Sequence, residues 1–111
     1  MSTILKLSSN AYVENETRFV FLDGNSCKTI EQCYVTLKDQ LSLPDYFGNN
    51  LDALEEVLGD LDWLTEGTIK FIILNSKKLL SEDISKKDSF LEILNTSENE
   101  RLEIIYLGEE K

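Results

Sequence analysis

Three short apolar runs, far apart in the chain, most constrain how this sequence can fold. They cover residues 18–23, 68–74 and 102–107 and read RFVFLD, TIKFIIL and LEIIYL. Gly24 follows the first run and Asn75 follows the second, and such residues typically end strands. None of the runs approaches the roughly 20 apolar residues that a membrane span requires. Each run is therefore predicted to be a buried β-strand.

The segments between these strands repeat their apolar residues at helical spacing. The spacing predicts helices over residues 29–42, 51–60 and 83–95. Pro44, the only proline, cannot continue the first of these helices. Strands separated by helices favour parallel pairing through right-handed crossovers. The order of elements therefore predicts a small α/β domain of two or three layers.

The length of the chain predicts one domain, because 111 residues can build one hydrophobic core but not two of ordinary size. Residues 1–111 are accordingly expected to fold as a single unit. The segment 1–17 allows two interpretations. Its apolar residues Ile4, Leu5 and Leu7 could form an extra edge strand, whereas its polar residues favour a loop or an N-terminal extension.

The chain is strongly acidic. It has 21 Asp and Glu residues against 11 Lys and Arg residues, a net charge of −10. This charge disfavours direct binding to nucleic acid or to an anionic membrane and favours a basic partner, although many soluble proteins are acidic only for solubility. Residues 1–8 lack the basic and apolar regions of a secretion signal, so a cytoplasmic protein is expected.

The sequence contains no histidine, which removes the commonest general base and the commonest metal ligand. Cys27 and Cys33 have no further Cys or His with which to complete a zinc site, and we interpret them as buried, reduced thiols. No metal and no cofactor are therefore expected. Any catalysis would depend on carboxylates alone.

The second predicted helix has an acidic face opposite a stripe of leucines. No Lys or Arg lies between Lys38 and Lys70 to offset this charge. One interpretation is a solvated amphipathic face. A carboxylate pair acting as general acid and base, as in glycosidases, would also need a cleft that one helix face does not provide. The acidic residues are Asp52, Glu55, Glu56 and Asp60.

A polar loop with two aromatic residues, Tyr46 and Phe47, precedes this helix. Both rings could anchor the loop in the core. One of them could instead be exposed and contact a partner, since aromatic side chains beside charged groups are common binding anchors. Periodicity does not decide between these alternatives.

Residues 43–54, LPDYFGNNLDAL, resemble the signature L-P-x-Y-[YF]-G-x-N-x-D-A-L of the barstar family. The resemblance extends more weakly to the elements on either side and so covers most of the chain. It implies a three-stranded parallel sheet packed with three to four helices. It also implies a non-catalytic immunity or antitoxin protein, monomeric when free, that binds a basic, barnase-like ribonuclease toxin one to one.

In barstar-like proteins the second helix and the loop before it enter the active-site groove of the nuclease, where carboxylates take the places of substrate phosphates. The resemblance therefore implies that Tyr46 packs against the nuclease and that Glu56 is the central phosphate mimic. Gly48 and Asn50 are assigned to loop and cap geometry, with Gly48 providing backbone freedom. The expected partner-binding residues are Tyr46, Asn50, Asp52, Glu55, Glu56 and Asp60.

The sequence departs from the family prototype at three positions. Glu55 stands where the prototype has a tryptophan, and Glu56 stands where it has the central aspartate. The acidic contact late in the third helix has no clear counterpart, because an ungapped comparison places Thr96 there, with Glu98 nearby. These departures leave an alternative open, in which the chain is an acidic nucleic-acid mimic for a different basic partner.

Overall fold

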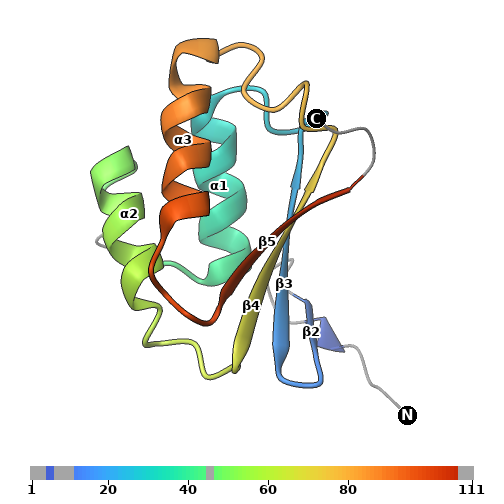
Figure 1. Ribbon diagram of the computed structural model, residues 1–111, viewed down its shortest axis with the longest axis vertical. Coiled ribbons are helices and arrows are strands. Elements are labelled where there is room, and N and C mark those ends of the chain that lie inside the picture. The colour runs from blue at the N-terminus through green and yellow to red at the C-terminus, as the bar shows by residue number, and fades with distance from the viewer. Residues whose placement is uncertain (1–4, 7–11, 45–46, 108–111) are drawn as a thin grey trace.

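The computed structural model describes residues 5–6, 12–44 and 47–107, which form a five-stranded sheet and three helices (Figure 1). The predicted helix 51–60 and the strands 68–74 and 102–107 are confirmed, and the other predicted elements differ by one residue at one or both ends. Within the described ranges no helix is long and apolar enough to cross a membrane. In chain order the elements are β1 Leu5–Lys6, β2 Tyr12–Glu14, β3 Thr17–Asp23, α1 Ile30–Leu41, α2 Leu51–Asp60, β4 Thr68–Leu74, α3 Ile84–Thr96 and β5 Leu102–Leu107.

The sheet is mixed, which corrects the expected three-stranded parallel sheet. Strands β3, β4 and β5 pair in parallel as predicted, but β1 and β2 extend the sheet with antiparallel pairs. The β2–β3 hairpin turns at Asn15 and Glu16, whose φ angles are 54° and 63°. Two positive φ angles are typical of two-residue hairpin turns, which usually contain glycine. The Asn-Glu sequence conceals this turn. Leu5 lies in the edge strand β1, whereas Ile4 and Leu7, on which the edge-strand interpretation also rested, lie outside the described residues.

The three helices of the described chain cover one face of the sheet, so the domain has two layers (Figure 1). Alternate residues of β3 point toward the helices, and Val20 and Leu22 are fully buried there. Phe71 and Ile73, their partners in the β3–β4 register, are buried on the same side. The helices meet these strands with apolar side chains that are also buried, among them Leu37, Leu41, Leu54, Leu58, Phe90 and Leu94.

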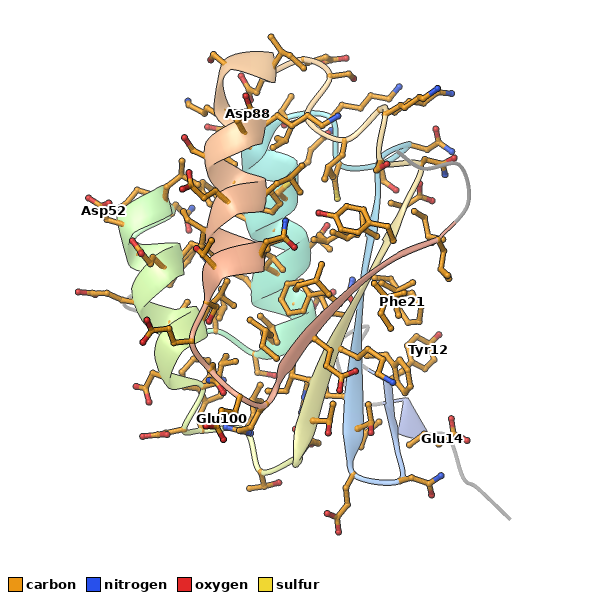
Figure 2. All side chains as sticks on the ribbon, in the orientation of Figure 1. Tyr12, Glu14, Phe21, Asp52, Asp88 and Glu100 are labelled. Atoms are coloured by element: carbon orange, nitrogen blue, oxygen red, sulfur yellow. The ribbon has the colours of Figure 1, made fainter. Side chains whose placement is uncertain are left out.

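The opposite face of the sheet carries aromatic rings. Phe21 packs edge-on against Tyr12, with ring centroids 6.1 Å apart, and stacks on Phe19 at 6.3 Å. The Nζ of Lys70 lies 5.9 Å from the centre of the Phe19 ring. Figure 2 shows Tyr12, Phe21 and Glu14 on the side of the molecule away from the helices. A substitution of Glu14 therefore serves as a control for changes on the helical side.

A buried ion pair ties β3 to the segment after α2. Arg18 Nε lies 3.0 Å from Glu66 Oε1, with side-chain exposures of 6% and 12%. Arg18 Nη1 also donates to the carbonyl of Gln40 at 2.9 Å. Burial alone would raise the pKa of Glu66, but the hydrogen bonds that its carboxylate accepts from Arg18 and from its own backbone lower the pKa below its usual value.

Because of this ion pair, we expect the free energy of unfolding to fall at acid pH. The pKa of Glu66 is lower in the folded state, so its stabilising contribution is complete above the unfolded pKa of about 4.3 and is lost as the pH falls through the folded value. Urea unfolding of the wild type and Glu66→Gln between about pH 7 and pH 3 measures this contribution. The variant should be less stable at neutral pH, and the difference should shrink in acid; a constant difference would contradict the assignment.

Candidate functional site

The start of α2 is defined by Asn50, which caps the helix with its side chain. Its Oδ1 accepts a hydrogen bond from the backbone N–H of Ala53 at 2.8 Å, and its Nδ2 donates to the carbonyl of Gly48 at 3.2 Å. The positive φ of this loop, 52°, belongs to Asn49 and not to Gly48. A Cβ on Gly48 would lie 3.0 Å from the Asn50 amide nitrogen. The glycine therefore provides close approach, which corrects the role of backbone freedom assigned to it.

We expect Asn50→Ala to destabilise the protein by about 1 kcal/mol, the usual cost of losing a side-chain cap. The variant loses the bonds to Ala53 and Gly48 but no buried apolar contact, because Asn50 is exposed. Urea denaturation against wild type measures the loss, and Asn50→Asp, which keeps the accepting oxygen, should restore most of it. An unchanged denaturation midpoint in Asn50→Ala would show that the cap contributes little.

The end of α2 is held by Arg101, which lies immediately before β5. Its guanidinium donates to the carbonyls of Leu61 at 2.9 Å, of Leu64 at 2.6 Å and of Glu66 at 2.8 Å. Leu61 ends the helix in a left-handed conformation with φ 53°. One side chain thus satisfies three carbonyls of the loop that follows the helix, and Asn99, two residues earlier, donates to the last carbonyls of α2.

The two sides of α2 differ in chemistry as predicted. Leu54 and Leu58 are fully buried against the core, and Leu51 is half-buried. Figure 2 shows Asp52 projecting from the start of the helix, away from the sheet. Within the part of the chain that the structure describes, no cation forms an ion pair with the acidic face. The exposed carboxylates of this α2 face are Asp52, Glu55, Glu56 and Asp60.

Asp60 differs from the other three carboxylates because it interacts with a second acid. A hydrogen bond with the side chain of Asp62 raises the pKa of Asp60, and slight desolvation and repulsion between the two charges act in the same direction. The last turn of α2 therefore takes up a proton more readily than an isolated aspartate. Asp62 could not be predicted from helical spacing, because it follows the end of the helix.

Two shallow hollows of about 350 Å³ each flank α2. The first lies toward α1, and its walls include Tyr34, Asn50 and Asp52. The second lies toward α3, and its walls include Asp52, Glu55 and Glu92. Glu92 is exposed and was missed by the sequence analysis, since only the packing of α3 beside α2 brings it to this face. Thr96 also lines the second hollow, one turn beyond Glu92.

The loop before α2 is anchored by Phe47. This ring is 6% exposed and packs edge-on against Tyr34 of α1, with centroids 5.7 Å apart. Phe47 is therefore an anchor in the core, which both alternatives for this loop allow. Tyr46 lies outside the described residues, and its contact with a partner stays a prediction.

The α2 face carries exposed negative charge that is spread along one helix. Among the described residues, no group of three or more Asp, Glu, Cys or His side chains could hold a metal ion. The carboxylates are exposed on a helix surface, and the neighbouring hollows are shallow. Such a surface suits electrostatic attraction of a cationic protein.

Comparisons with known proteins identify similar sequences. Residues 17–106 match the family model described as "Barstar (barnase inhibitor)". A Bacillus subtilis (strain 168) protein named "Putative ribonuclease inhibitor YrdF" is 46% identical over 41 residues, which are 37% of this chain and 45% of that protein. The matched region thus spans less than half of the relative's length.

Proposed function

This chain belongs to the barstar family, and on that premise we propose that it is a stoichiometric protein inhibitor of a ribonuclease. The α2 face and the loop before it occlude the basic active site of the enzyme. The partner is a barnase-like or other ribonuclease toxin bound one to one, and the chain is the corresponding immunity protein, monomeric when free and acting in the cytoplasm.

The observation that carries this proposal is the group of exposed carboxylates on α2, none of which is paired with a cation of the described chain. A ribonuclease binds RNA phosphates with Arg and Lys side chains. Arg donates to a carboxylate in the same fork geometry as to a phosphate, and Lys attracts either group as a point charge. Because these carboxylates form no ion pairs within the described chain, no such pair has to break before they bind a partner. Glu56 lies within this face and is the central phosphate mimic in our proposal.

The neighbouring elements widen the contact surface. Glu92 on α3 adds a carboxylate beside Asp52 and Glu55, and the hollow toward α1 offers the exposed residues Asn49 and Asn50. A specific interface buries about 800 Å² on each partner, which one short helix does not supply alone. We therefore include the α3 side of the second hollow in the surface that contacts the nuclease.

Titration into a ribonuclease tests the proposal. Purified protein is added to a barnase-like enzyme, or to a nuclease encoded beside its gene, and the cleavage of a fluorescent RNA is followed. Loss of cleavage at a one-to-one ratio is expected, with association that slows as salt rises because opposed charges steer the encounter. Glu14→Ala, on the far side of the sheet, should inhibit like the wild type.

Full cleavage at excess protein, with no complex on a sizing column, would contradict the proposal for that enzyme. Binding to a basic DNA-binding protein instead would favour the alternative of a general nucleic-acid mimic. That alternative predicts binding through scattered charge, so single substitutions on α2 would each have small effects. A ribonuclease complex predicts that one or two of these residues dominate.

A further inference from the structure

Two buried thiols lie together at the start of α1. Cys27 is 1% exposed and precedes the cap of the helix, while Cys33 is 0% exposed and lies within the helix. Cys27 Sγ is 3.5 Å from Thr36 Oγ1. Thr36 follows Cys33 by three residues, so both side chains lie on the same face of α1 and both adjoin Cys27. The Cys27 and Cys33 side chains are hydrogen-bonded to each other.

The backbone holds both cysteines in place. The N–H of Cys27 donates to the carbonyl of Asp23, and its carbonyl accepts from the N–H of Leu80, both at 2.9 Å. The N–H of Cys33 donates to the carbonyl of Thr29 at 3.2 Å in the first turn of the helix. The thiols are therefore neighbours in a rigid part of the fold, and their approach does not depend on a mobile loop.

The two thiols differ in acidity. The hydrogen bond from Cys33, together with the one from Thr36, outweighs burial and lowers the pKa of Cys27 to about 6. The same bond to Cys27 raises the pKa of Cys33, and burial adds to this increase. Cys27 is thus the thiol that ionises first, and the thiolate is the nucleophile in thiol–disulfide exchange.

A surface hollow of about 300 Å³ lies at the start of α1, and some of its wall residues neighbour Cys27 in the chain or contact it. Its walls include Ser26, the residue before Cys27, and Thr36, which contacts the Cys27 sulfur. Glu31 also lines this hollow and gives it a negative charge. A small, positively charged reagent therefore suits this hollow, whose wall residue Thr36 contacts the Cys27 sulfur.

We propose that Cys27 and Cys33 form an oxidisable dithiol, which a small disulfide converts to an intramolecular disulfide at the start of α1. The Cys27 thiolate attacks one sulfur of the reagent, forms a mixed disulfide and releases the first small thiol. The Cys33 sulfur then attacks Cys27, and its proton leaves with the second small thiol. Two protein thiols are oxidised, and the reagent takes up the two electrons and two protons as two thiols.

Oxidation of the folded protein by cystamine tests the proposal without any ribonuclease. The full chain is incubated with cystamine, quenched in acid, unfolded and alkylated, and its intact mass is measured. The wild type is expected to lose two hydrogens and to carry neither an alkyl group nor a cysteamine. Cys33→Ala should stop with one cysteamine on Cys27. Cys27→Ala should react at least about tenfold more slowly, because burial raises the pKa of the remaining Cys33 thiol and little of the thiolate forms.

Thr36→Val is the matched variant, since it keeps both thiols and the size of the side chain. It removes the hydroxyl beside the Cys27 sulfur and should slow the first step several-fold. Three results would overturn the proposal: a wild type that keeps two alkylatable thiols, equal rates in the two alanine variants, or oxidation no faster than global unfolding measured under the same conditions. Circular dichroism of each variant checks that the fold is kept.

Discussion

Glu56→Ala is expected to weaken binding to the target ribonuclease by about 2–5 kcal/mol, roughly 30-fold to several-thousand-fold in the dissociation constant. The side chain is exposed in the free protein and forms no ion pair within the described chain. Its loss should therefore change stability by less than about 0.5 kcal/mol. In the complex the substitution leaves cationic groups of the enzyme buried without a partner, which is where the large cost arises.

Inhibition constants and dissociation rates measure this effect, with Glu14→Ala as a control of the same residue type on the opposite side of the sheet. Truncation of a buried charged contact should mainly raise the dissociation rate. Glu56→Gln separates charge from shape, because it keeps the length of the side chain and should recover only a small part of the affinity. Equal inhibition by wild type and Glu56→Ala would remove Glu56 from the interface.

Arg101→Ala is expected to lower the free energy of unfolding by about 3 kcal/mol or more. The variant leaves the carbonyls of Leu61, Leu64 and Glu66 without their charged donor, and such hydrogen bonds contribute about 1.5–3 kcal/mol each, although their contributions do not add fully. A loss of this size is a large fraction of the stability of a small domain. Urea denaturation followed by circular dichroism measures it.

Two further variants serve as comparisons for that measurement. Arg101→Lys keeps the charge but lacks the planar fork that reaches three carbonyls, so it should restore only part of the stability. Lys77→Ala also removes one exposed cation and should change the free energy of unfolding by less than about 0.5 kcal/mol. If Arg101→Ala were as stable as Lys77→Ala, the loop after α2 would not depend on this side chain.

Local patterns in the sequence were sufficient to predict most elements. Helical spacing identified residues 51–60, and the β-branched runs identified 68–74 and 102–107, because each of these patterns reflects burial of one side of the element. The β2–β3 hairpin was not predicted, since Asn15 and Glu16 adopt a turn without the usual glycine. Short edge strands also bury little surface and leave a weak signal.

Only the part of the candidate site that lies within one helix could be predicted from the sequence. The acidic face follows from spacing along one helix, whereas Glu92 and Arg101 reach α2 from distant positions in the chain. No periodicity within a segment reports the packing of α3 beside α2 or the approach of Arg101 to the loop after it. The sequence also does not show why residue 48 is a glycine. Only the structure shows that the Asn50 side chain lies close to Gly48, rather than that Gly48 needs backbone freedom.

The order of strands in the sheet also bears on how the protein is made. Neighbouring strands in space are consecutive in the chain, from β1 to β5, so each new strand can pair with one that the ribosome has already released. The α2 face is synthesised between β3 and β4, but Arg101, which holds the loop after this helix, follows α3. Under the proposed function, we therefore expect nascent chains that stop before Arg101 to bind ribonuclease poorly.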